Sequence, residues 1–437
     1  MIRFALTFVV LLGATAPANA AVEIQEVTSP GGITAWLVEE DAVPFTALEI
    51  QFQGGGSLDR DGKRGAINLM TATLEEGAGE LDAQAFAVAR DELAASFSFD
   101  VGRDGLSVSV RFLTENRDEA LALLKLALTE PRFDEDAVAR VREQILSGLR
   151  SDLNDPNTIA GLRLNELAYG DHPYATSLDG TLDSVAALTR EDVVNAYGDV
   201  IVKDRIFVGA AGDISADELA TIMDDLFGDL PTGGAPLPPP VELQLTGGVT
   251  VEPLNVPQSV ALFGHIGIPR DDPDFFPAFV ANEVFGGGGL QSRLSMEVRE
   301  ERGLTYGIGS YLVNWDHANM LLGQFATAND RAAEAIQVVL DEWAKIAAEG
   351  VTEEELDAAK TYLTGAYPLR FDSNASIARI LVGMQADGLP IDYIETRNSK
   401  VEAVTLEDVK RVSERLYQPE ALRFVVVGQP DGLEGVN

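Results

Sequence analysis

The sequence predicts an α+β fold of two duplicated domains, each built from a mixed or antiparallel sheet with helices packed on it. The first observation behind this prediction is a repeat. The segment from Thr189 to Gly212 matches the segment from Thr405 to Gly428 without a gap, so both ends fall at one offset. The second observation is that runs typical of strands cluster between long helical patterns instead of alternating regularly with them.

Strands and helices are distinguished by the spacing of their apolar residues. Alternating or continuous apolar runs predict strands at residues 45–53, 94–100, 106–113 and 206–211. Helical spacing appears in three groups: Ile67, Met70 and Leu74; Leu121, Leu124 and Leu128; Val138, Val141 and Ile145. We therefore expect sheets and helices to form separate layers within each half.

The chain divides into four segments by composition. Residues 1–20 have the basic start, short apolar core and Ala-Asn-Ala end of a signal peptide, so we expect cleavage before Ala21 and a periplasmic protein. Residues 231–245 form a linker that is rich in Pro and Gly over its first ten positions. Residues 21–230 and 246–437 are the predicted N-terminal and C-terminal domains. No later segment has the length and apolar character of a membrane span.

Charge and cysteine content exclude several kinds of function. The formal charge of -38 arises from 70 acidic against 32 basic residues, so no extended basic surface is expected for nucleic acid. The absence of cysteine removes thiolate zinc sites and cysteine nucleophiles. The acidity itself is typical of a soluble surface.

The most informative motif is an arginine followed seven residues later by a tyrosine, after a run of four glycines. A guanidinium can donate several hydrogen bonds to carbonyl groups, and a phenol can donate to an oxygen that develops negative charge. The alternative is structural: Leu290, Leu294 and Val298 would form the inner face of a helix, and the tyrosine would be an ordinary strand residue. The residues of the motif are Gly286, Gly287, Gly288, Gly289, Arg299 and Tyr306.

The glycine run has two interpretations that the residues leave open. No Gly-Lys-Ser or Gly-Lys-Thr follows residues 286–289, which disfavours a phosphate-binding loop. The run can serve as a hinge where backbone approaches a substrate, or as a purely structural turn.

Taken together, these features resemble the pitrilysin/insulinase family of inverted-zincin peptidases. The resemblance is carried by the duplicated halves, by Gly-Gly-Gly-Ser-Leu-Asp at residues 54–59 and by residues 282–306. It implies a fold that forms half of a clam-like chamber. It also implies that Arg299 and Tyr306 bind the peptide backbone and polarise the carbonyl under attack, with residues 286–289 near the substrate.

The chain departs from the family where active members carry His-x-x-Glu-His and a distal glutamate. Asn68 and Ala72 replace the two histidines, Thr71 replaces the glutamate between them, and Gly148 aligns with the distal glutamate. These side chains cannot supply the ligands that zinc requires. The chain has three histidines, and no two of them have the i, i+4 spacing that places two side chains on one face of a helix. We expect all three to be structural: His172, His265 and His317.

The resemblance therefore implies a zinc-free, substrate-binding subunit of a heterodimeric peptidase, inactive alone. A homologous partner subunit would carry the zinc, and unfolded peptides would be the substrates. No nucleic acid partner is expected. The alternative is a non-catalytic homologue that serves as a structural or peptide-binding, chaperone-like protein.

Overall fold

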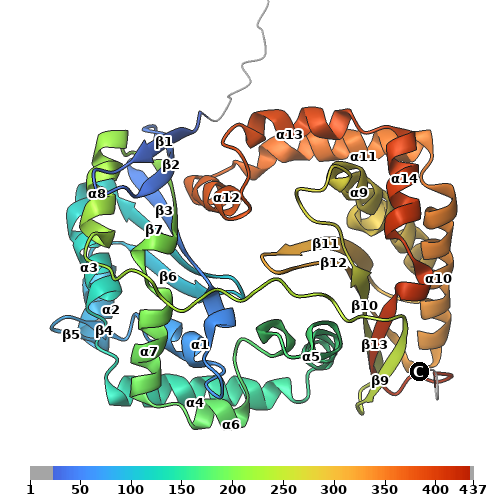
Figure 1. Cartoon of the computed structure of the whole chain (residues 1–437), viewed down its shortest axis with the longest axis horizontal. Helices are drawn as coiled ribbons and strands as arrows, with labels where there is room; N and C mark the ends of the chain where they lie inside the picture. The colour runs from blue at the N-terminus through green and yellow to red at the C-terminus, as the bar shows by residue number, and fades with distance from the viewer. Residues whose placement is uncertain (1–22, 434–437) are drawn as a thin grey trace, which may run out of the picture.

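Figure 1 shows a computed structural model of the chain, which describes residues 23–433. The expected signal peptide, residues 1–20, and its cleavage site at Ala21 lie outside the described residues. None of the helices within residues 23–433 combines the length and apolar content that a membrane span requires.

The N-terminal half contains a mixed six-stranded sheet in the order β1-β2-β8-β3-β7-β6. Strands β2 and β8 are parallel, and every other neighbouring pair is antiparallel. The four strands predicted from the apolar runs are present, with ends within two residues of the prediction. The strands are β1 (Gln25–Thr28), β2 (Thr34–Glu39), β3 (Phe45–Gln53), β6 (Ser96–Val101), β7 (Gly105–Leu113) and β8 (Ile206–Gly212), with a small separate hairpin of β4 (Gly77–Ala78) and β5 (Leu81–Asp82).

The C-terminal half repeats this arrangement in a five-stranded sheet, order β11-β12-β10-β13-β9. Here β13 and β9 are the parallel pair. Each strand has a counterpart in the first sheet, because the series β9, β13, β10, β12, β11 has the same order and directions as β2, β8, β3, β7, β6. This correspondence confirms the predicted duplicated α+β fold. The strands are β9 (Gly248–Pro253), β10 (Gln258–Ile266), β11 (Ile308–Trp315), β12 (Ala318–Ala328) and β13 (Arg423–Gly428).

Helices pack on both sheets, and the repeated segments begin helices in the same way. Thr189 and Thr405 each start a helix with a capping box, in which the threonine hydroxyl accepts from the backbone N–H three residues on and the aspartate there accepts in return. The helices of the first half are α1 (Ala66–Ala72), α2 (Ala83–Glu92), α3 (Arg117–Thr129), α4 (Glu135–Asp152), α5 (Pro156–Tyr169), α6 (Leu182–Ala186), α7 (Arg190–Val200) and α8 (Ala216–Phe227). Those of the second half are α9 (Phe275–Asn282), α10 (Ala332–Glu349), α11 (Glu353–Ala366), α12 (Asn374–Ala386), α13 (Tyr393–Glu402) and α14 (Leu406–Leu416).

The two halves exchange one helix each. Helix α12 of the second half packs on β8 and β3, where Leu381 shares an apolar cluster with Trp36 of the first sheet. Helix α5 of the first half packs on β10 and β13, where Leu164 lies with Val425. Each sheet is therefore covered on one face by a helix from the other half.

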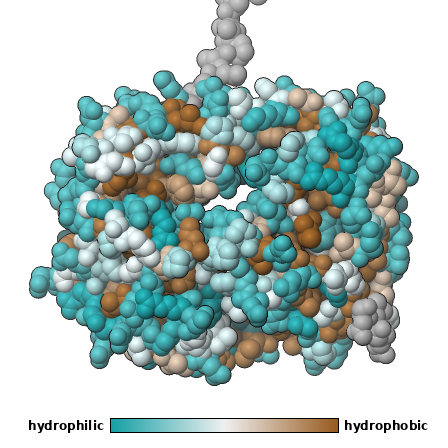
Figure 2. All heavy atoms as spheres, viewed as in Figure 1, coloured by the Kyte–Doolittle hydropathy of each residue, from teal (hydrophilic) through white to brown (hydrophobic). Residues whose placement is uncertain are grey.

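The segment between the halves carries no helix or strand over residues 231–245. It is held at a few points, including a hydrogen bond of 3.0 Å from the Val241 N–H to the His317 carbonyl. Figure 2 shows the molecule hollowed at its centre, between the two halves. The domain boundary at residues 231–245 remains a prediction.

Candidate functional site

The segment from Glu283 to the start of β11 is irregular. It contains a π-helix at Glu283–Gly287, a 3₁₀ turn at Gly289–Gln291 and a second π-helix at Ser295–Glu300. The expectation of one helix with three buried leucine or valine residues is wrong in part: Leu294 and Val298 are fully buried, but Leu290 is 63% exposed. π-Helical turns are rare and occur frequently at functional sites.

The guanidinium of Arg299 lies against the aromatic ring of Tyr306. Its guanidinium carbon is 5.6 Å from the centroid of the tyrosine ring, a distance typical of a cation–π contact. Its Nη1 lies 2.8 Å from Glu300 Oε1, an ion pair without hydrogen-bond geometry. The motif's arginine and tyrosine are thus brought together.

Tyr306 itself is 91% exposed. It precedes β11 by two residues and follows Gly303, which has a φ of +60°, so the structural alternative of an ordinary strand residue is wrong. No hydrogen bond engages its hydroxyl within residues 23–433. The phenol therefore points to solvent from a turn, although a large ring is usually at least half-buried.

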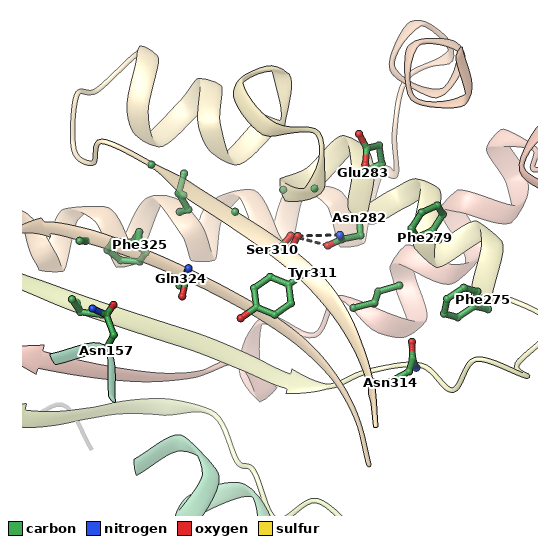
Figure 3. A pocket seen from close by; sticks show the side chains of 18 of the residues that line it. Asn157, Phe275, Phe279, Asn282, Glu283, Ser310, Tyr311, Asn314, Gln324 and Phe325 are labelled. Atoms are coloured by element: carbon green, nitrogen blue, oxygen red, sulfur yellow. Dashed lines mark hydrogen bonds between the residues drawn. The ribbon is translucent and has the colours of Figure 1, made fainter. Parts of the chain in front are cut away.

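Beside Tyr306 a groove of about 760 Å³ follows strand β11. Strand β11 is an edge of its sheet, so its outer backbone groups are open to a further strand except at Ser310, whose carbonyl accepts from the Asn282 side chain. The groove is bounded by β11, by α9 and by the glycine run (Figure 3). Gly286 and Gly287 line it, whereas Gly288 and Gly289 are not among its lining residues.

A buried pair of polar residues fixes the floor of the groove. The Ser310 hydroxyl donates to Asn282 Oδ1 over 2.7 Å, and Asn282 Nδ2 donates to the Ser310 carbonyl over 3.1 Å (Figure 3). A Cβ on Gly286 would lie 2.2 Å from the Ser310 hydroxyl. The first glycine of the run is therefore required for close packing against β11, which supports the structural interpretation at this position.

Glu283 stands beside the glycine run, where its carboxylate approaches Gly287 and Gly288. Burial raises the pKa of Glu283, and the positive charge of Arg397 partly opposes this effect. The residue lines the groove without an ion-pair partner inside the described chain. Sequence reasoning missed Glu283, Asn282 and Ser310; adjacency to the glycine run was the available signal for the first two.

The positions equivalent to the zinc ligands do not fit a metal ion. Asn68 Nδ2 donates to Asp179 Oδ1 over 2.8 Å, and the buried hydroxyl of Thr71 donates to a carbonyl of its own helix over 2.8 Å. Ala72 is an exposed methyl group, and a Cβ on Gly148 would meet no atom within 4 Å. Across residues 23–433 no three His, Asp or Glu side chains gather closely enough to hold a metal.

The fold nevertheless keeps the altered helix in place. Asp59, the last residue of the Gly-Gly-Gly-Ser-Leu-Asp segment, accepts hydrogen bonds from the N–H groups of Gly65 and Ile67 at 2.7 and 2.8 Å. These bonds satisfy donors at the start of α1, which have no partner inside the helix. The segment that resembles the family therefore has a structural role here, independent of metal.

The three histidines have local roles. His265 is buried, and its Nδ1 lies 2.7 Å from the Ile266 carbonyl. His172 and His317 come from opposite halves and meet edge to face with their ring centroids 5.8 Å apart. Their placement agrees with the expected structural role.

Comparison with known proteins supports the family resemblance. Residues 187–363 match the family model described as "Peptidase M16 inactive domain". The crystal structure of a peptidase M16 inactive domain from Pseudomonas fluorescens superposes with a TM-score of 0.86 at 28% identity, covering 93% of this chain and 98% of that one. The chain is similar to the pitrilysin-like M16 peptidases over nearly its whole length. The resemblance inferred from residues 54–59 and 282–306 is thus confirmed.

Among the M16 relatives, one is named as lacking peptidase activity. The "Non-peptidase homolog YmxG" of Helicobacter pylori is 26% identical over 392 residues, covering 89% of this chain and 90% of that protein. An "Uncharacterized zinc protease" of Mycobacterium leprae is also 26% identical, over 395 residues, covering 89% of this chain and 88% of that protein. The altered zinc positions of this chain, Asn68, Thr71, Ala72 and Gly148, fit a family member that lacks the zinc motif.

Proposed function

We propose that this chain is the zinc-free, substrate-binding subunit of a two-chain peptidase that degrades unfolded peptides in the periplasm. A homologous partner subunit would supply the zinc ion and the general base. This chain would supply Arg299, Tyr306 and part of the wall of a shared chamber.

The observation that carries the proposal is the exposed phenol of Tyr306 beside an open sheet edge. An aromatic ring that is 91% exposed contributes little packing to its own fold and suits a side chain that meets a partner's substrate. Arg299 lies against the ring and places a positive charge 5.6 Å from the ring centroid. In that position the hydroxyl can donate a hydrogen bond to a carbonyl oxygen as negative charge develops on it.

Peptide would bind as an added strand along β11. Main-chain hydrogen bonds to an edge strand give affinity with little demand on sequence. The groove beside β11 offers about 760 Å³ for the side chains of such a strand. Gly287 borders it without a side chain, so substrate backbone can come close there.

A second candidate is a peptide-binding protein that never cuts, with structural or chaperone-like use. The name of the Helicobacter pylori relative favours it. Both functions use the β11 groove. Only the peptidase function needs Arg299 and Tyr306 as hydrogen-bond donors to the substrate. A binder without a cutting partner would tolerate the loss of the Tyr306 hydroxyl.

Co-purification followed by a peptidase assay tests the proposal. The chain is expressed with a hexahistidine tag in the source cell, and proteins that co-purify are identified by mass spectrometry. We expect an M16 homologue that carries His-x-x-Glu-His, and turnover of an unfolded peptide only when both chains are mixed. The mature N-terminus of the exported chain should be Ala21; a chain that retains residues 1–20 in the cytoplasm would contradict the proposed location.

A further inference from the structure

A second cavity, of about 280 Å³, gathers positive charge in this acidic protein. It lies between α9, the 3₁₀ turn Tyr367–Arg370 that follows α11, α12 and α13. Three arginines line it, Arg270, Arg370 and Arg397, with one carboxylate, Asp387. The whole chain has a net charge of -38, so three guanidinium groups around one small cavity form a local excess of positive charge.

Arg397 is a buried charge without a direct ion pair, and the carboxylate that influences it is Glu283, through a longer-range attraction. The residue is 5% exposed, and its Nη1 donates to the Leu363 carbonyl at 2.7 Å and to Asn398 Oδ1 at 2.9 Å. Its guanidinium carbon lies 4.5 Å from the centroid of the Tyr367 ring. Within residues 23–433 no carboxylate forms an ion pair with it, and burial lowers the pKa of Arg397. A buried guanidinium without an ion pair destabilises the fold, and a bound anion would remove part of this free-energy cost.

The neighbouring groups add to the positive charge. Arg270 has only a long ion pair, with Nε 3.8 Å from Asp387 Oδ2. Arg370 is exposed at the cavity, and no carboxylate in the described part of the chain pairs with it. Lys400 Nζ lies 5.4 Å from the centroid of the Tyr393 ring. Arg270 Nη2 already donates to the Tyr393 hydroxyl over 3.2 Å, and Arg397 Nη1 donates to the Leu363 carbonyl. The guanidinium of Arg370 and the remaining N–H groups of Arg270 and Arg397 are the donors that the cavity offers to an anion.

Aromatic rings form the rest of the wall, so an anion with an apolar group attached suits the cavity. The aromatic lining residues are Phe275, Phe276, Phe279, Tyr367 and Tyr393. A volume near 280 Å³ is just below the usual range for small-molecule sites, roughly 300–1,000 Å³. It can enclose about one large side chain together with a carboxylate.

The cavity adjoins the groove along β11. Arg270, Phe275 and Phe279 line both. Asn314, near the end of β11, donates to the Ile268 carbonyl over 2.7 Å, two residues before Arg270. Figure 3 shows Phe275 and Phe279 at the end of the groove where Asn314 lies. A peptide that runs parallel to β11 would therefore bring its C-terminus to the arginines.

We propose that the arginine-lined cavity binds the C-terminal carboxylate of a peptide together with its last, apolar side chain. The inference rests on the proposed binding of peptide along β11. Arg397 and Arg370 would share the carboxylate as donors of charge-assisted hydrogen bonds, and the rings of α9 would enclose the side chain. The site would select peptides with free C-termini, such as the products of an earlier endopeptidase.

Calorimetric titration of the purified chain tests the carboxylate site. The probes are an N-acetylated hexapeptide that ends in phenylalanine and the same peptide with a C-terminal amide. We expect the free acid to bind at least about tenfold more tightly than the amide, because charge-assisted hydrogen bonds replace neutral ones. Arg370→Gln, at an exposed position that folding does not require, should remove most of this preference without changing the affinity for the amide.

Two further variants complete the test. Arg397→Met should abolish the preference and keep the packing between Tyr367 and Phe279; its melting temperature reports whether it folds. Arg331→Gln is the matched control, because Arg331 lies in the same half and pairs with Glu334 at 3.0 Å. Equal binding of acid and amide, or a preference that survives Arg370→Gln, would overturn the carboxylate site and leave the peptide-binding subunit standing. Absence of binding by both peptides would overturn both.

Discussion

Arg293 and Glu355 are joined by two parallel hydrogen bonds of 2.6 Å each, from Nε to Oε1 and from Nη2 to Oε2. The pair fastens the irregular segment that contains Arg299 and Tyr306 to the first turn of α11. Glu355 also accepts from Thr352 in the capping box of that helix. Two parallel bonds fix the position of a planar guanidinium more firmly than a single contact.

This pair predicts a pH dependence of stability. Although burial opposes the shift, hydrogen bonds from Arg293 and Thr352 lower the pKa of Glu355 to about 2, from an ordinary value of 4.5. The stabilisation is therefore complete above about pH 4.5 and is lost as the pH falls from 4.5 toward 2. Glu355→Gln should lower the melting temperature by about 2–4 °C at pH 7. The gap between variant and wild type should shrink by pH 3; an unchanged gap would contradict the assignment.

The packing of the glycine run predicts a position-specific effect. Gly286→Ala places a methyl group on the Ser310 hydroxyl, and overpacking of this kind costs about 1–3 kcal/mol. Gly307→Ala is the control, since a Cβ there meets no atom within 4 Å and should change stability by less than about 0.5 kcal/mol. Urea unfolding of both variants measures the difference. Equal stabilities would show that the groove floor is not tightly packed.

The altered zinc positions predict that metal binding can be rebuilt. The wild-type chain should bind no stoichiometric zinc. The triple variant Asn68→His, Ala72→His, Gly148→Glu supplies two imidazoles on one face of α1 and a carboxylate from α4, the three-ligand set of catalytic zinc sites. Thr71 is left unchanged because it is buried, and a carboxylate there would be costly. Metal analysis should find about one zinc per triple variant; none would show that Gly148 has been aligned wrongly.

The helix exchange predicts the behaviour of a nicked chain. Residues 231–245 carry no helix or strand, so limited proteolysis should cut there first. The two fragments should nevertheless stay together, because α5 and α12 each pack on the other half's sheet. Size-exclusion chromatography of the nicked protein, followed by a denaturing gel, tests this. Fragments that separate without denaturant would contradict the exchange.

Much of the fold could be predicted from local sequence, because a sheet strand buried on one or both faces shows its period directly. Residues 45–53 form β3 with the predicted ends, and the repeats at Thr189 and Thr405 begin equivalent helices. The spacing of Ile67, Met70 and Leu74 predicts a helix that includes Leu74. Helix α1 ends earlier, at Ala72, and Leu74 is buried just after its end. Tertiary packing of the following turn buries that leucine, which periodicity alone cannot distinguish from a helical position.

The remaining features depend on contacts between distant segments. An apolar stripe on α5 or α12 predicts that a face is buried, but it does not reveal that the covering sheet belongs to the other half. The same spacing fits an α-helix and a π-helix over one turn, so the irregular path around Arg299 and the exposure of Leu290 were not predictable. Asn282 and Ser310, 28 residues apart, are paired only by the fold.

The turnover of a reconstituted complex with Tyr306→Phe tests the central claim most directly. The substitution deletes one hydroxyl on a ring that is 91% exposed, so the melting temperature and the affinity for the partner should stay near wild type. Turnover per assembled complex should fall by roughly 10²- to 10³-fold, the usual effect of losing a donor to a developing oxyanion. Arg299→Lys should also lower turnover, because an ammonium group cannot replace a planar guanidinium. Turnover within about twofold of wild type for Tyr306→Phe would show that the pair is structural and would contradict the proposed function.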